Sequence, residues 1–517
     1  MSAAKSHDLV TVVKEVHNPV MFRFSPQPNR AQLIPWQEWS DDAFRAARAE
    51  DKPVMLFLGA FWCRYCQRMD EEAFSETENI ALLNAYFISL RVENAQRPDV
   101  DARYNLNGWP TLAFVTPAGE LLAAANFMPA EEFKELLLNV YLGYQAKPVT
   151  ERLRPAIVEP QSDSAPPREI NAARALTEIT DAVMALADRV HGGYDRGQKF
   201  IHPQVNDFLL DRYEATNDRR YLDQVCLTLQ RMRAGELCDQ EGGAYFRTSS
   251  NSDWSHPHRE KLLLEEAGLL ANCLSVFRLT KRAEFQRMAE EIIQYLNGKL
   301  FDPARGAFFG CEDWLRHESP AAGAGEFFTI IDRCIYTDAN AVTSAAYLEA
   351  ALLLGKPQYR ERALKTLEFL WQNCCTDGRG MFHYFDGAGH VPGLLLDQAQ
   401  MGLALLRAHE ATRDAMCLER ARRLAEFVIT QLKNPAGGFY DIGAEELAAL
   451  VLRLTLIEQN GAAASFFLRL AAATRDEKYR DAAGWALCSF TADFAQYGVH
   501  AAPFGRALGE LLSITTG

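Results

Sequence analysis

The pattern of hydrophobic and polar positions changes near residue 145 and so divides the chain into two parts. The first part alternates short apolar runs of strand length with amphipathic stretches of helix length. We expect helices over residues 40–48 and 131–141, the first of them capped by Ser40. The expected strands are residues 53–58, 85–92, 112–115 and 121–125, with a hairpin turn at residues 117–120. Their order, β-α-β-α-β-β-α, predicts an α/β domain.

The second part consists of long amphipathic helices with almost no strand-like alternation. Examples are residues 172–189, 259–280, 339–354 and 395–411. A turn signal recurs between the helices, in which one or two glycines lead into an aromatic residue. It occurs at Gly192-Gly193-Tyr194, Gly242-Gly243-Ala244-Tyr245, Gly306-Ala307-Phe308, Gly380-Met381-Phe382 and Gly437-Gly438-Phe439. The intervals indicate roughly six helical hairpins, which predict a closed (α/α)6 toroid; an open helical solenoid is the alternative.

A proline-rich stretch with little apolar periodicity lies between the two parts, as in a linker. We therefore expect an α/β domain with an N-terminal extension at residues 1–145, a linker at residues 146–168 and the toroid at residues 169–517. A chain of 517 residues has room for this organisation.

Composition narrows the functional classes. No apolar run approaches the roughly 20 residues that cross a bilayer, and residues 1–19 carry charges where a signal peptide would be apolar. The net charge of −14 gives no reason to expect nucleic acid as a partner. The odd number of cysteines, 11, favours reduced thiols with one functional pair over a secreted disulfide framework. We expect a cytoplasmic protein with no membrane or nucleic-acid partner, and the sequence indicates no oligomeric state.

The most informative motif is Phe61-Trp62-Cys63-Arg64-Tyr65-Cys66, which follows an expected strand and precedes helix-forming residues. Its spacing places Cys63 at a helix N-terminus, where a thiolate is favoured, and Cys66 one turn later. Half of a zinc site and two unrelated core cysteines are the alternatives. No Cys or His lies between Cys66 and His191 to complete a metal site, so we predict no metal. A second segment, Gly108-Trp109-Pro110-Thr111, follows about 45 residues later, which is the order of a thioredoxin-type dithiol site.

Several motifs in register resemble one family. In the first part they are Trp39, Ala43-Phe44, Asp51-Lys52-Pro53, Cys63-x-x-Cys66, Met69, Phe74, residues 97–101 and Gly108-Trp109-Pro110. In the second they are Lys199-Phe200, Pro203, Asp239-Gln240-x-Gly242-Gly243, Arg247 and Trp254-x-x-Pro257-His258-x-Glu260-Lys261. Together they resemble the spermatogenesis-associated protein 20 type of thioredoxin-domain family. The resemblance implies a thioredoxin-like domain followed by a toroid similar in fold to N-acylglucosamine 2-epimerases and six-hairpin glycosidases.

At the dithiol motif the position of each residue indicates its role, and the resemblance implies a cis peptide bond at Pro110. We expect Cys63, beside Trp62, to be the attacking thiolate and Cys66 the resolving thiol, with no cofactor beyond this redox-active disulfide. A cis peptide bond at Pro110 would hold the Trp109 backbone ready to pair with an extended substrate.

The chain departs from the family at this motif. Family members commonly carry a C-H-W-C-H pattern, whereas this chain has Arg64-Tyr65 inside the motif and Gln67 after it. Arg64 is a permanent cation that should favour a thiolate. Thioredoxin itself has a buried acid six residues before its first cysteine, where this chain has Phe57. These departures favour a dedicated redox role over general thioredoxin activity.

The toroid offers candidates for a sugar-binding or proton-transferring cavity, because carbohydrate-active relatives line theirs with aromatic, carboxylate and histidine side chains. The candidates are Lys199, Asp239, Arg247, Trp254, His258, Glu260, Lys261, Asp338, Asn340 and Asp397. We expect His258 and Glu260 to follow the start of a helix, where Glu260 could equally be a first-turn carboxylate. The family's Asp-Asn pair appears here as Glu265-Glu266, a change that weakens the transfer of sugar chemistry.

Three hypotheses follow. The first is a thiol-disulfide oxidoreductase that acts on a protein or small-molecule disulfide, with the toroid selecting the substrate or binding a carbohydrate ligand. The second is a carbohydrate-active enzyme, epimerase or glycosidase, with the thioredoxin-like module as a redox switch or cap. The third is a binding protein without turnover.

Overall fold

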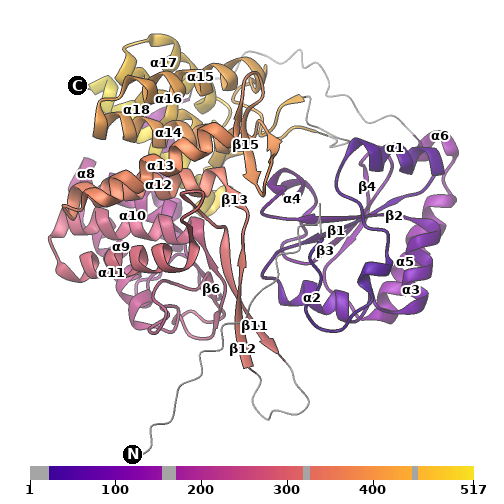
Figure 1. Cartoon of the computed structure of the whole chain (residues 1–517). Helices are drawn as coiled ribbons and strands as arrows, with labels where there is room; N and C mark the ends of the chain where they lie inside the picture. Colours follow the sequence, from indigo (N-terminus) through magenta and orange to yellow (C-terminus); the bar gives the residue numbers. More distant parts are fainter. Residues whose placement is uncertain (1–21, 154–169, 318–325, 445–451, 517) are drawn as a thin grey trace, which may run out of the picture.

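The protein is described by a computed structural model over residues 22–153, 170–317, 326–444 and 452–516. Residues 22–153 form the N-terminal module and residues 170–516 form the toroid, and the two pack against each other (Figure 1). No helix in the described part is long and apolar enough to cross a membrane.

The N-terminal module is a four-stranded sheet with helices around it. Its strands are β1 (Val54–Gly59), β2 (Ile88–Glu93), β3 (Thr111–Val115) and β4 (Leu121–Ala125). Its helices are α1 (Asp41–Glu50), α2 (Arg64–Glu71), α3 (Thr77–Tyr86), α4 (Pro98–Tyr104), α5 (Ala130–Gln145) and α6 (Val149–Arg152), with a short 3-10 helix at Ala31–Leu33. The order across the sheet is β2-β1-β3-β4, with β1 and β2 parallel and the other pairs antiparallel. This is the predicted thioredoxin-like fold.

Local sequence explains these elements. Every residue of β1 is buried, as expected of a central strand covered on both faces. Ser40 caps α1, since its hydroxyl accepts a hydrogen bond from the Ala43 N–H at 3.3 Å. The predicted strand 85–92 was wrong at its start, because α3 continues through Tyr86 and β2 begins at Ile88. A short apolar run is ambiguous between the end of a helix and the start of a strand.

The toroid is a closed ring of helical hairpins. Its inner helices among the described residues are α8 (Pro203–Thr216), α10 (Leu263–Thr280), α12 (Thr337–Leu353), α14 (Leu395–Thr412), α16 (Ile457–Thr474) and α18 (Ala502–Thr516). The outer helices are α7 (Ala172–Leu186), α9 (Arg219–Ala234), α11 (Ala283–Tyr295), α13 (Pro357–Asn373), α15 (Ala415–Gln431) and α17 (Glu477–Leu487). Each inner helix packs on the next and α18 packs on α8, so the ring closes and the open-solenoid alternative is wrong. The first helix, α7, pairs with the last, α18.

Short strands lie at one end of the toroid, the end that faces the N-terminal module (Figure 1). They are β5 (Lys199–Phe200), β6 (Thr248–Ser249), β7 (Pro257–His258), β8 (Lys261–Leu262), β9 (Phe301–Asp302), β10 (Ala307–Phe308), β13 (Ile335–Tyr336), β14 (Cys375–Thr376), β15 (Gly380–Phe385) and β16 (Gly389–Pro392). A longer hairpin is formed by β11 (Cys311–His317) and β12 (Glu326–Asp332). The sequence analysis missed these strands. Apart from β11, β12 and β15, which have six or seven residues, they are only two to four residues long and carry no measurable alternation.

The glycine-aromatic turns are held by amide side chains near the starts of the inner helices. Asn340 of α12 accepts from the Phe308 N–H at 2.8 Å and donates to the Phe308 carbonyl at 2.9 Å. Asn460 of α16 makes the same pair of bonds with Phe439, at 2.8 and 3.0 Å. Gln398 of α14 does so with Met381, at 2.8 and 3.3 Å. We call this arrangement the amide clamp; it fixes each turn against the next hairpin of the ring.

The predicted linker, residues 146–168, lies partly outside the described residues, which resume at residue 170. Its first part forms α6, where Arg152 pairs with Asp51 of the N-terminal module. The end of α1 therefore contacts the segment that leaves the module.

Candidate functional site

Cys63 and Cys66 are joined in a disulfide at the N-terminus of α2. Cys63 is the N-cap residue, and its sulfur accepts a hydrogen bond from the Cys66 N–H at 3.1 Å. Both cysteines are 5% exposed. Unpaired N–H groups and the helix dipole favour negative charge at this position, so the fold places Cys63 where a thiolate is stabilised.

Two tryptophans border the disulfide. Trp62 and Trp109 meet edge to face with their ring centroids 5.3 Å apart. The indole N–H of Trp109 donates to Asp101 at 2.9 Å. The peptide bond between Trp109 and Pro110 is cis, as the family resemblance implied. These contacts hold the Trp109-Pro110 loop against Trp62, the residue before Cys63.

Arg64 lies further from the chemistry than its sequence position suggests. Its side chain is 50% exposed and extends along α2, where it donates to Gln67 at 3.3 Å and lies 3.7 Å from Glu71. The guanidinium therefore faces the helix surface and solvent.

Beneath the disulfide, the face of the sheet carries apolar and charged residues together. Phe57 occupies the strand position where thioredoxin has its acid, and the Arg91 guanidinium lies 4.5 Å from its ring centroid. Arg91 forms a two-pronged ion pair with Asp70, at 2.8 and 2.9 Å. Burial raises the pKa of Asp70, although Arg91 acts in the opposite direction.

A cavity of about 460 Å³ opens onto the disulfide, and we call it the disulfide cavity. Cys63, Cys66 and Glu93 of the N-terminal module line it. The toroid lines it too, through residues that include Asp332 and Tyr384. Access to the disulfide through this cavity therefore passes between the two modules.

Buried charges tie the modules together. Arg103 of α4 binds both carboxylate oxygens of Asp441 in the toroid, at 2.7 and 3.0 Å, and donates to the Leu452 carbonyl at 2.8 Å. The two charged side chains are only 7% and 2% exposed. Removing one partner of such a pair leaves an uncompensated buried charge, which costs about 3–5 kcal/mol.

Arg247 and Glu260, two predicted candidates, lie at this junction. The Arg247 guanidinium lies 4.0 Å from the Trp62 ring centroid, and its Nε donates to Glu260 at 2.7 Å. We call residues 60–63, between β1 and α2, the redox loop. The toroid thus places a cation against the Trp62 ring of this loop.

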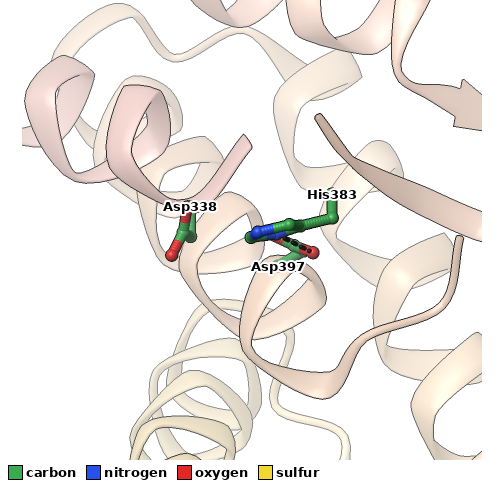
Figure 2. A group of neighbouring side chains, drawn as sticks. All are labelled: Asp338, His383 and Asp397. Carbon is green, nitrogen blue, oxygen red and sulfur yellow. Dashed lines mark hydrogen bonds and ion pairs between the residues drawn. The ribbon is translucent and has the colours of Figure 1, made fainter. Parts of the chain in front are cut away.

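A second cavity, of about 260 Å³, lies at the mouth of the toroid, and we call it the junction cavity. The redox loop lines it through Phe61 and Trp62. Its toroid side includes Glu265 and the cluster Asp338, His383 and Asp397 shown in Figure 2. The predicted candidates Asp338 and Asp397 are therefore brought together at the mouth, beside a histidine that the sequence analysis did not name.

His383 uses both ring nitrogens in this cluster. Nδ1 lies 3.0 Å from an Asp397 oxygen, and Nε2 lies 2.7 Å from the carbonyl oxygen of Ala95 in the N-terminal module. Burial opposes the charged imidazolium, but the charge and hydrogen bond of Asp397 outweigh it and raise the pKa of His383 to about 9. Burial also raises the pKa of Asp397, to about 6. Between about pH 6 and about pH 9, His383 is therefore positively charged and Asp397 negatively charged.

The cluster can be tested as a metal site. One ligand atom from each of the three residues lies within 4.8 Å of the others. A metal ion would need a lone pair of His383, however, and both nitrogens face oxygen acceptors. The arrangement fits a doubly protonated histidine that binds the two modules together better than it fits a ligand set.

The structure places the other toroid candidates in supporting roles. Lys199 has no exposed surface and binds Asp188 at 2.8 Å. Lys261 pairs with Asp239 at 2.6 Å, and together they hold the loop at Gly243, whose carbonyl accepts from Lys261 at 3.0 Å. Trp254 is buried with its indole N–H on the His191 carbonyl. Asn340 belongs to the amide clamp.

His258 does not follow a helix start, as the sequence analysis expected. It lies on β7 and is exposed, with Nε2 3.2 Å from the Ser250 hydroxyl, whereas α10 begins only at Leu263. The short strands β7 and β8 occupy the residues before the helix, where β7 pairs with β6 and β8 pairs with β11.

Sequence reasoning did not single out Glu93, Glu265 or His383 as site residues. His383 directly follows a glycine-aromatic turn, which was a usable signal for the toroid mouth. Glu93 ends a strand whose partner strand leads to the cysteines, but that pairing is not visible in one sequence.

Fold and site together define a two-module protein with a thioredoxin-like domain and a closed helical toroid. Residues 26–152 match the family model Thioredox_DsbH, described as a protein of unknown function, DUF255. The N-terminal module thus carries the domain of that family.

The chain is also homologous to spermatogenesis-associated protein 20 of Rattus norvegicus. The two are 28% identical over 305 residues, which cover 54% of this chain and 38% of the rat protein. The chain spans about two fifths of the length of the curated relatives it matches first. A shorter match, 33% identical over 102 residues, covers 18% of this chain and 17% of the thiol:disulfide interchange protein DsbD of Yersinia pestis.

The toroid resembles solved sugar-epimerase structures. Cellobiose 2-epimerase of Spirochaeta thermophila matches with a TM-score of 0.54 and 14% identity, covering 67% of this chain and 96% of that chain. At this identity the likeness shows the fold alone.

Proposed function

We propose that this chain is a thiol-disulfide oxidoreductase that uses Cys63 and Cys66. The observation that carries the proposal is the disulfide at the N-terminus of α2, bordered by Trp62 and the Trp109-Pro110 loop. The similarity of the N-terminal module to a protein named as a thiol:disulfide interchange protein supports it.

The geometry suits thiol-disulfide exchange. Cys63 is the attacking group, because its sulfur is the helix cap and accepts an N–H bond that stabilises a thiolate. Cys66 lies one turn further along and can reach the same sulfur, so it resolves the mixed disulfide. The electrons come from a thiol reductant that re-reduces the pair.

The toroid acts in substrate selection. It lines the disulfide cavity and places Arg247 on Trp62, so a disulfide substrate meets both modules at once. A cavity of about 460 Å³ has the size of a small-molecule site and also suits a few residues of an extended chain. The substrate class is therefore a small-molecule or protein disulfide.

The deciding experiment is a redox titration of the whole chain in graded thiol/disulfide buffers. Free thiols are alkylated and located by peptide mass spectrometry. We expect one two-electron transition confined to Cys63 and Cys66. The other nine cysteines, which are free, are the internal control. If Cys63 and Cys66 titrate like those nine, or if Cys63→Ser retains disulfide-reducing turnover, the proposal is wrong.

The second candidate is a carbohydrate-active enzyme. The cluster of Asp338, His383 and Asp397 at the mouth of an epimerase-like ring favours it. It requires His383 to exchange a proton with a sugar, although its Nε2 is bound to the Ala95 carbonyl. Assays of Asp397→Asn and Cys63→Ser on sugar and disulfide substrates separate the candidates, since each variant should abolish only one activity. Binding without turnover of either substrate would leave a binding protein.

A further inference from the structure

The face of the sheet beneath the disulfide lacks the acid that thioredoxin uses, and a different strand supplies one. β1 and β2 run parallel, with Phe57 opposite Arg91 and Gly59 opposite Glu93. Side chains in register on neighbouring strands point to the same face. The Glu93 side chain therefore lies beside the position where Gly59 has none.

The side of Gly59 that a side chain would occupy faces Cys66. A β-carbon added there would lie 3.5 Å from Cys66 Sγ. Glu93 is thus the carboxyl-bearing neighbour of the strand position that touches the resolving cysteine. Both Glu93 and Cys66 line the disulfide cavity, so the two residues border the same space.

The Glu93 carboxylate is held in place by the redox loop. The Phe61 N–H, two residues before Cys63, donates to it at 3.0 Å. Burial raises the pKa of Glu93 to about 8. A carboxyl group that titrates near the range of a thiol is suited to exchange a proton with one.

Charged groups of both modules surround Glu93. Arg23 lies over the Phe61 ring, 3.3 Å from its centroid, and attracts the carboxylate. The charge of Asp332, from the toroid, raises the pKa of Glu93. Burial raises the pKa of Cys311 in the toroid, and the charge of Glu93 acts in the same direction. On the same face, Asp70 is already paired with Arg91.

We propose that Glu93 is the proton acceptor of the resolving step, taking the Cys66 proton across the disulfide cavity and returning it to the departing thiolate. This inference rests on the proposed function and assigns a residue to it.

The steps balance as follows. The Cys63 thiolate attacks a disulfide R–S–S–R′, forms a bond to one sulfur and releases R′–S⁻, which takes a proton from solvent. The Cys66 thiol gives its proton to the Glu93 carboxylate, and the Cys66 thiolate attacks Cys63 Sγ. The intramolecular disulfide forms, R–S⁻ leaves, and the Glu93 carboxyl protonates it. The substrate disulfide gains two electrons and the dithiol loses two; a thiol reductant restores the pair.

The test separates the two chemical steps. Reduced protein is mixed with an aromatic disulfide whose released thiolate is coloured, so that Cys63 attack and Cys66 resolution each give a signal. In Glu93→Gln we expect the first release to keep its rate and the second to slow about a hundredfold at pH 8. In the unaltered chain the second rate should rise with pH through about 8, as Glu93 loses its proton. Glu93→Gln should lose that inflection, and Glu93→Asp should restore part of the rate.

Two further variants complete the design. Glu135→Gln removes an exposed carboxylate on α5, outside the lining of the disulfide cavity, and should leave both releases unchanged. Asp332→Asn removes the toroid charge that raises the pKa of Glu93, so the profile of the second release should move to lower pH. This shift tests the inference even if Glu93→Gln does not fold.

Equal slowing of both releases in Glu93→Gln, or no change in either, would overturn the inference, as would an unshifted profile in Asp332→Asn. These outcomes differ from failure of the proposed function, in which the unaltered chain itself would give no second release.

Discussion

Charged side chains that are fully buried in the toroid hold loops in place. The Lys199 ammonium binds the Asp188 carboxylate at 2.8 Å and the Gly192 carbonyl at 2.9 Å, and it also donates to the Asp195 carbonyl. Burial alone would raise the pKa of Asp188, but hydrogen bonds from Lys199 and from backbone N–H groups lower it to about 2. The ion pair thus stabilises the loop that leads into β5.

Lys199→Met should therefore destabilise the toroid by about 3 kcal/mol, because the Asp188 charge loses its partner. Denaturant unfolding measures the loss. Lys365→Met, at an exposed position of α13, is the matched control and should change stability by less than about 0.5 kcal/mol. The Cys63–Cys66 redox transition should not move. If Lys199→Met kept its normal stability but lost disulfide-reducing activity, Lys199 would instead be a residue of the functional site.

At the scale of elements, the amide clamp explains why glycine-aromatic turns recur. Gly306 has φ of 74°, in the left-handed region that glycine enters without strain. The turn then presents the backbone of Phe308 to Asn340, and the Phe308 ring packs on Tyr347 at 5.4 Å between centroids. A turn, a ring and an amide therefore form one unit of the repeat.

Asn340→Ala should destabilise the toroid by about 2–4 kcal/mol, since it leaves the buried N–H and carbonyl of Phe308 unpaired. Hydrogen exchange should quicken first in the turn around Phe308, and denaturant unfolding gives the total. Asn373→Ala is the control, because Asn373 is exposed and its amide donates to the Phe369 carbonyl of its own helix. Equal effects of the two substitutions would contradict the clamp.

Local patterns were sufficient to predict most elements, but not the partners of each element. The cysteine motif, the helix cap at Ser40 and the glycine-aromatic turns depend on neighbours in sequence, and they were predicted. The placement of Glu93 beside Gly59 depends on a pairing between strands 34 residues apart. The interaction of His383 with Ala95 joins residues 288 apart. Such contacts follow from tertiary packing, so Asp397 was predicted without its partner.

At the scale of the whole molecule, the two modules act as one unit. α18 closes the ring against α8 and also packs on α7, and the N-terminal module covers the mouth through Arg103 and Ala95. The disulfide cavity and the junction cavity share Phe61, Glu93 and Asp332 among their lining residues. Single side chains therefore lie between the disulfide cavity and the junction cavity.

The ion pair between His383 and Asp397 should make the contact between the two modules sensitive to alkaline pH. The folded-state pKa of His383, about 9, exceeds the unfolded value of about 6.5. Its stabilisation is therefore complete below about pH 6.5 and is lost as pH rises through about 9. We expect the unfolding midpoint of the chain to fall over this range. Buried carboxyls such as Glu266, whose pKa burial raises to about 8, contribute to the same decline.

His383→Gln isolates the contribution of the histidine, because the glutamine amide can still donate to the Ala95 carbonyl but cannot carry a charge. The difference in unfolding midpoint between the two proteins should be largest near pH 6.5 and vanish above pH 9. Hydrogen exchange of residues 94–104 locates the effect, since faster exchange there reports loss of contact between the modules. A midpoint difference that stays constant from pH 6 to pH 10 would show that His383 is neutral in the folded chain. The link between the modules would then depend on the buried ion pair of Arg103 and Asp441.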